Sequence, residues 1–198
     1  IPFMKKATLS VLFALLVSFV YSQTSLSAGQ IAITSFNSDG SDNFSFVLLA
    51  DVTSGTEIKF TENGWDSGAF RSGEGTITWT ATSNLTCGTE ISLDAASAST
   101  GTVAVSGSWA LSASGDQILA YQGTEASPTM IFAINFDGAG WVSSDTSNTS
   151  DLPTGLTDGT NAVNLGEIDN GQYDCSTTSD QNAVLTAVST AGNWTLNN

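Results

Sequence analysis

Residues 31–65 read IAITSFNSDGSDNFSFVLLADVTSGTEIKFTENGW, and this stretch decides the fold class because short apolar runs alternate with clusters of Gly, Asp, Asn and Ser. In the second run, Phe44, Phe46 and Leu48 fall on one face of an extended chain, and apolar residues also fall on the other face. In the third run, EIKFT, apolar and polar residues alternate, as in a strand with one face in water. The stretch therefore predicts consecutive strands of an all-β sandwich rather than βαβ units.

The same pattern continues through most of the chain. No internal sequence repeat of about 20 to 50 residues is visible, which argues against a solenoid or a propeller. We expect strands at Gln30–Phe36, Asn43–Ala50, Glu57–Thr61, Gly75–Thr80, Glu90–Leu93, Val103–Ser106, Gln117–Tyr121, Thr129–Asn135 and Ala162–Leu165. Apolar residues at three-to-four spacing predict one short C-terminal helix, Asp180–Thr190, with Ser179 as its N-cap. The polar segment from Asp137 to Asp158 is expected to be a long surface loop.

Charge and composition exclude several function classes. The 198 residues include 19 Asp and Glu, 4 Lys and Arg and no His, which gives a formal net charge of −15. This charge repels phosphate backbones and anionic lipid, so the sequence argues against nucleic-acid binding. Without His there is no Ser-His-Asp or Cys-His nucleophile system. The hydrophobic content of 40%, with 5 Trp and 10 Phe, is enough for a packed core.

The N-terminus has the layout of a secretory signal peptide: a basic start (MKK), the apolar run Leu9–Val20 and a small-residue exit at Ser22. The run is shorter than the ~18 residues of a membrane-spanning helix, which disfavours an anchor. We expect residues 1–22 to be the signal peptide, with residues 1–3 as upstream sequence. Residues 23–198 then form a single β-sandwich domain that is secreted or held at the extracellular cell surface, without membrane insertion after cleavage.

The sequence contains two cysteines, Cys87 and Cys175. An even count in an exported chain favours a disulfide between them. Closing a loop of about 90 residues would stabilise the fold by ~3–5 kcal/mol in the chain-entropy model. The alternative is two separately buried thiols.

Three further strings matter beyond residues 31–65: FRSGEGTITWTA at 70–81, GSWALSASGDQILAYQG at 107–123 and the closing NWT at 193–195. With them, the chain resembles a module of exported and cell-surface bacterial proteins that is similar, in the order of its segments, to the lamin-tail immunoglobulin-like domain. The resemblance covers nearly all of the chain after the signal peptide. It implies an immunoglobulin-like, lamin-tail-like β-sandwich and an extracellular address. It implies no activity, because such modules accompany enzymes or adhesins without performing the chemistry.

One loop is a candidate calcium site. Asn37, Asp39, Asp42 and Asn43 place side-chain oxygens around Gly40, and oxygen ligands are what Ca²⁺ prefers. The bidentate Glu of an EF-hand is missing from the loop. The same residue types also make turns by bonding their own backbone. Both a calcium site and a simple turn remain open for this loop.

A second loop is a candidate ligand site because it gathers carboxylates, aromatic rings and a rare basic residue: Glu62, Trp65, Asp66, Phe70, Arg71 and Glu74. Such a mixture can hold a sugar, with Trp65 or Phe70 as the stacking platform. The alternative is that Arg71 forms an internal ion pair and Trp65 packs in the core.

These observations predict a secreted, non-catalytic binding or adhesion module that is directed at an extracellular glycan or cell-surface protein, with Ca²⁺ as a possible cofactor. One alternative is a structural subunit that self-associates through edge strands into a surface layer or fibre. A second alternative is a carbohydrate-active hydrolase that uses a carboxylate pair, either Glu62 with Glu74 or Asp116 with Glu125.

Overall fold

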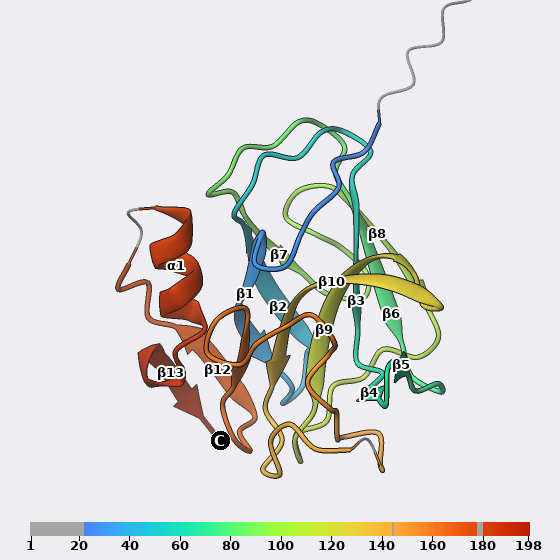
Figure 1. The fold of residues 1–198 in the computed structure, drawn as a ribbon, viewed down its shortest axis with the longest axis vertical. Coiled ribbons are helices and arrows are strands. Elements are labelled where there is room, and N and C mark those ends of the chain that lie inside the picture. Colours follow the sequence, from blue (N-terminus) through green and yellow to red (C-terminus); the bar gives the residue numbers. More distant parts are fainter. Residues whose placement is uncertain (1–21, 144, 178–179) are drawn as a thin grey trace, which may run out of the picture.

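The computed structural model describes residues 22–143, 145–177 and 180–198 (Figure 1). Residues 1–21 of the predicted signal peptide, and the predicted helix cap Ser179, lie outside the described residues. Within the described residues, no helix has the length and apolar character needed to cross a membrane.

Two large sheets and one small hairpin make up the fold. The five-stranded sheet has the order β13–β12–β1–β2–β7, with bounds β1 Ile31–Asn37, β2 Asn43–Leu48, β7 Glu90–Leu93, β12 Asn170–Tyr173 and β13 Trp194–Asn197. The six-stranded sheet has the order β11–β10–β9–β3–β6–β8, with bounds β3 Glu57–Thr61, β6 Thr76–Thr80, β8 Thr102–Ser106, β9 Gln117–Thr124, β10 Ser127–Asn135 and β11 Ala162–Asn164. The hairpin pairs β4 (Trp65–Asp66) with β5 (Ala69–Phe70).

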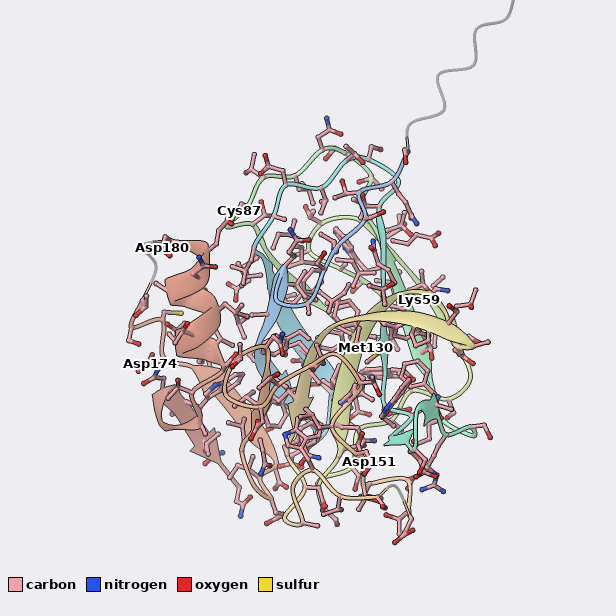
Figure 2. All side chains as sticks on the ribbon, in the orientation of Figure 1. Lys59, Cys87, Met130, Asp151, Asp174 and Asp180 are labelled. Carbon is pink, nitrogen blue, oxygen red and sulfur yellow. The ribbon has the colours of Figure 1, made fainter. Side chains whose placement is uncertain are left out.

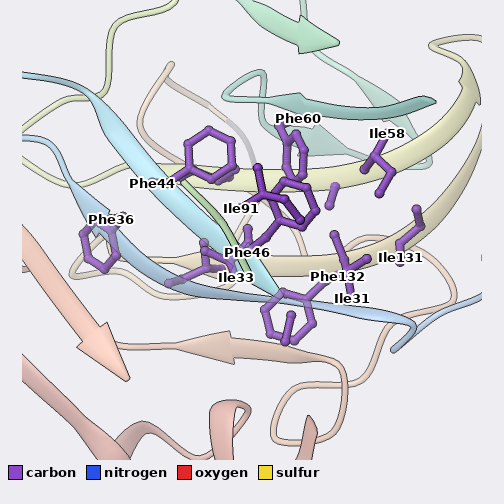
Figure 3. Packing of buried hydrophobic residues seen from close by; sticks show 14 of the residues in the cluster. Ile31, Ile33, Phe36, Phe44, Phe46, Ile58, Phe60, Ile91, Ile131 and Phe132 are labelled. Atoms are coloured by element: carbon purple, nitrogen blue, oxygen red, sulfur yellow. The ribbon is translucent and has the colours of Figure 1, made fainter. Parts of the chain in front are cut away.

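The two large sheets face each other across an aromatic core (Figures 1 and 3). Phe44 of β2 lies 4.8 Å from Phe60 of β3, measured between ring centroids. Phe46 lies 5.3 Å from Trp79 of β6 in an edge-to-face arrangement. The alternation predicted from residues 31–65 therefore places its apolar face against the opposite sheet. An all-β fold with one short helix is confirmed.

Helix α1 (Gln181–Val188) lies beside β1, and the short 3₁₀ turn η1 (Ala191–Asn193) leads from it into β13 (Figure 1). Strand β12 pairs only with the last three residues of β1, so the preceding part of β1 is left for α1 to flank. The helix lies within the predicted range, but its N-cap is Asp180, whose carboxylate accepts a hydrogen bond from Ala183 N at 2.9 Å.

The predicted strands are confirmed with small shifts at their ends, whereas the hairpin strands β4 and β5 and the strands β12 and β13 were not predicted. Strands β12 and β13 are four-residue strands of mixed composition, NGQY and WTLN, without a regular polar alternation. β12 pairs with the edge of β1, and β13 pairs in turn with β12, so both strands depend on tertiary contacts.

Candidate functional site

A groove of about 640 Å³ lies between α1 and the outer face of the five-stranded sheet, and we call it the helix groove. The sheet contributes the apolar side chains of Val47 and Leu49 together with Glu90. The helix side contributes Val184 and the acidic cap Asp180. The groove therefore combines an apolar floor with an acidic rim.

The helix groove contains two free thiols in place of the predicted disulfide. Cys175 is exposed, has a φ of 55° and directs its Sγ at the carbonyl oxygen of Tyr173, 3.7 Å away. Cys87 is half-buried and lies on the sheet side of the same groove, near Asp180 in Figure 2. The two cysteines thus share one surface feature, as the predicted pairing required, but no bond joins them.

A second cavity, of about 360 Å³, lies over β1, β12 and β13 of the same sheet. Its lining is almost entirely amide and hydroxyl side chains, including Asn37, Asn170 and Gln172. Both cavities are thus on the five-stranded sheet. Neither is lined by any residue of the 62–74 loop.

The 62–74 loop is largely committed to the fold. Trp65 is only 5% exposed and packs in a small apolar cluster with Leu119 and Tyr121 on the outer side of the six-stranded sheet. Phe70 is half-buried between Trp65 and Tyr121, at centroid distances of 5.0 and 4.8 Å. The hairpin β4–β5 is therefore a cover for this sheet, and Trp65 does not present an open ring for stacking.

The polar residues of this loop behave differently from one another. Asp66 is exposed, whereas Arg71 is partly buried and its Nη1 is a buried atom without a hydrogen-bond partner among the described residues. Arg71 lowers the pKa of Glu74, but desolvation and the charge of Glu62 outweigh it and raise that pKa to about 7. The charge of Arg71 thus acts on the pKa of Glu74, and a direct ion pair of Arg71 stays a prediction.

Glu62 is a buried structural carboxylate. It is 1% exposed, and its Oε1 accepts a hydrogen bond from Gly75 N at 2.9 Å. Ala110 N donates to both carboxylate oxygens, at 3.0 Å to Oε1 and 2.9 Å to Oε2. Gly75 permits this because a Cβ there would lie 2.5 Å from the backbone N of Trp109. Burial raises the pKa of Glu62, and the two backbone hydrogen bonds oppose the rise.

Asp116 is the second buried carboxylate near Glu62. It accepts hydrogen bonds from Ser112 N at 2.9 Å and from Gln117 N at 2.8 Å. Desolvation raises the pKa of Asp116 to about 8, and the charges of Glu62 and Glu74 add to the rise. The structure therefore brings Glu62, Glu74 and Asp116 into one electrostatic cluster, although the sequence had paired Asp116 with Glu125.

The predicted calcium loop is held by hydrogen bonds among its own residues. Asn37 Oδ1 accepts a hydrogen bond from Asp39 N at 3.1 Å, and the Asn43 amide donates to Ser41 Oγ at 2.7 Å. Asp39 points to solvent while Asp42 is half-buried, and burial raises the pKa of Asp42. In the part of the chain that the structure describes, no three His, Cys, Asp or Glu side chains group to hold a metal. These hydrogen bonds are those expected of a simple turn, and calcium binding at this loop stays a prediction.

Sequence reasoning missed the helix groove because its walls come from segments far apart in the chain. The one available signal was the pair of cysteines, which marked the turn before β7 and the segment after β12 as neighbours.

The chain was compared with family models, curated proteins and solved structures, and it matches none of them.

Proposed function

We propose that the protein is an extracellular, non-catalytic binding module whose ligand site is the outer face of the five-stranded sheet. The observation that carries this proposal is that the helix groove and the smaller cavity both lie on that sheet. The ligand is an extracellular glycan or a cell-surface protein. The signal-like N-terminus supports the extracellular address.

The same proposal includes the finer fold assignment, an immunoglobulin-like, lamin-tail-like sandwich. Two facing sheets of mostly antiparallel strands support it. The resemblance of residues 31–65 and 107–123 to that module supports it from the sequence side.

Two features favour binding over hydrolysis. Glycosidases hold two carboxyl groups on either side of an accessible sugar. Glu62 and Asp116 are 1% and 2% exposed and bind backbone N–H groups. The charge of Glu125, the other nominated acid, raises the pKa of Tyr121. It is not among the charges that raise the pKa values of Glu62 and Asp116. None of these nominated acids lines either cavity.

Blocking the helix groove tests the proposal. Alkylating Cys87 and Cys175 with N-phenylmaleimide places a bulky ring in the groove, and the signal on a glycan array should fall at least tenfold for any ligand that occupies the groove. The Cys87→Ser/Cys175→Ser double variant, treated with the same reagent, serves as the matched control and keeps its signal. Undiminished binding after complete labelling would exclude the helix groove as the site, and release of reducing sugar would contradict the absence of catalysis.

Self-association is a second candidate because β8 forms an open edge of the six-stranded sheet. Its sequence, TVAVS, has no charge, and Val105 is 40% exposed. An uncharged, exposed edge strand can pair with another copy of itself.

Val105→Lys should therefore abolish any concentration-dependent association, because a charge on an edge strand opposes pairing. Size-exclusion chromatography with and without divalent cations measures it, since cations screen the net charge of −15. The wild type would elute earlier with cations and the variant would not. Identical monomeric elution of both proteins under both conditions would remove this candidate.

A further inference from the structure

The outer face of the five-stranded sheet carries two cross-strand rows of uncharged polar side chains, which we call the amide array. The first row is Asn43, Asn37, Asn170 and Asn197, and the second row is Ser92, Ser45, Ser35, Gln172 and Thr195. In each row, the residues on neighbouring strands are direct partners in the backbone register. The array thus runs across the sheet from β7 or β2 to β13.

The alternation of side chains places both rows on the face away from the core. Phe44 and Phe46 of β2 are buried between the sheets, so Asn43 and Ser45 point to the opposite side. Phe36 of β1 packs on Phe136 at 4.2 Å in the same way. The array residues are half-buried or exposed throughout, which leaves them accessible to a ligand.

The spacing of the array is regular because the sheet fixes it. Neighbouring strands lie about 4.8 Å apart, and residues two apart on a strand are separated by roughly 6.6–6.8 Å. The array therefore presents hydrogen-bond donors and acceptors as a grid that extends roughly 14–19 Å across the strands. The Ser45 and Ser92 hydroxyls, 2.9 Å apart, show that neighbours in a row are within hydrogen-bond reach.

The centre of the array is hollowed and contains an unpaired acceptor. The 360 Å³ cavity is lined by members of both rows, including Asn37, Asn170 and Gln172. Asn170 Oδ1 is buried and has no hydrogen-bond partner among the described residues. A buried acceptor without a partner costs free energy, and a ligand hydroxyl that donates to it would remove that cost.

We propose that the amide array binds a neutral polysaccharide chain lying across the strands of the five-stranded sheet. Amide and hydroxyl groups both donate and accept, which matches the mixed donors and acceptors of sugar hydroxyls. The array contains no charged side chain, and the net charge of −15 repels polyanions. This inference rests on the proposed function and names the ligand class of its site.

A protein partner fits the array less well. Protein interfaces obtain most of their affinity from buried aromatic, Arg or large apolar anchors. The exposed large hydrophobic residues of the described chain are Val105, Val142 and Leu196, and none belongs to the array. The described aromatic rings are all buried or half-buried. The surface is thus suited to a ligand that is held by many hydrogen bonds.

Affinity electrophoresis of the whole exported protein in native gels tests the proposal. The probes are three neutral polysaccharides (hydroxyethyl cellulose, laminarin and galactomannan) and one anionic polysaccharide, polygalacturonate. We expect at least one neutral polymer to retard the protein and polygalacturonate not to retard it. Migration unaffected by every neutral polymer would overturn the proposal, and so would equal retardation by polygalacturonate.

The double variant Gln172→Ala/Thr195→Ala locates the binding. Both side chains are exposed partners in the second row, so their removal leaves the core intact and should weaken retardation about tenfold. The matched control is Thr102→Ala/Thr129→Ala, at exposed positions of the six-stranded sheet, which should bind like the wild type. Full binding by the array variant, with loss after maleimide labelling, would overturn the amide array and leave the helix groove as the site.

Discussion

Replacing Glu62 by alanine is expected to lower the free energy of unfolding by about 2–4 kcal/mol. The carboxylate holds the backbone N–H groups of Gly75 and Ala110, and so joins the start of β6 to the segment that precedes β9. Alanine removes both acceptors and leaves space in a buried site. Chemical denaturation followed by tryptophan fluorescence measures the change.

Glu62→Gln is the matched control for this loss. Oε1 accepts from Gly75 N and Ala110 N, and Oε2 shares the Ala110 hydrogen bond, so an amide oxygen at the Oε1 position keeps an acceptor for both N–H groups. The variant should stay within about 1 kcal/mol of the wild type, since it also removes a carboxyl that burial disfavours when ionised. Equal destabilisation by glutamine and alanine would show that the ionised carboxylate, rather than its hydrogen bonds, supports the fold.

The free energy of unfolding should fall by a few kcal/mol as the pH rises from 5 to 9. The pKa of Asp116 is raised from 3.8 to about 8 and that of Glu74 from 4.5 to about 7. Between those values the folded state keeps protons that the unfolded state has released, so raising the pH favours unfolding. Each fully buried group contributes up to about 1.4 kcal/mol per pH unit, and partial exposure of Glu74 reduces its share.

Thermal unfolding at intervals between pH 5 and pH 9 measures this dependence. Asp116→Asn should flatten the profile, at the cost of the hydrogen bond from Ser112 N. Asp158→Asn, at an exposed position, is the matched control and should leave the slope unchanged. A melting temperature that rises with pH over this range would contradict the assignment of raised pKa values to Asp116 and Glu74.

The strands were predictable because apolar residues recur at every second position along a strand. This alternation can be seen in the sequence without knowing which strand is the partner. The burial of Trp65 could also have been predicted from the sequence. The signal for it lies in β9 rather than in the loop that contains Trp65. Ile118 and Ala120 face the core between the sheets, and Leu119 and Tyr121 make the other face of β9 apolar as well. A strand that is apolar on both faces needs a cover on its outer side, and the hairpin of Trp65 and Phe70 supplies it.

The proposed binding surface was not predictable in the same way. The helix groove depends on where α1 lies, and α1 lies beside β1 because β12 pairs with only part of that strand. The rows of the amide array depend on register between strands that are distant in sequence, such as Asn37 with Asn170. Residue types alone cannot supply that register, which is why the polar residues of 62–74 stood out instead.

Hydrogen–deuterium exchange with and without the neutral polysaccharide that retards the protein tests the central claim, that ligands bind the outer face of the five-stranded sheet. Bound ligand should slow exchange in peptides that cover β1, β2, β12 and β13. Exchange in the 62–74 segment and in β8 should not change. Slower exchange confined to residues 62–74, with no change in the five-stranded sheet, would contradict the account.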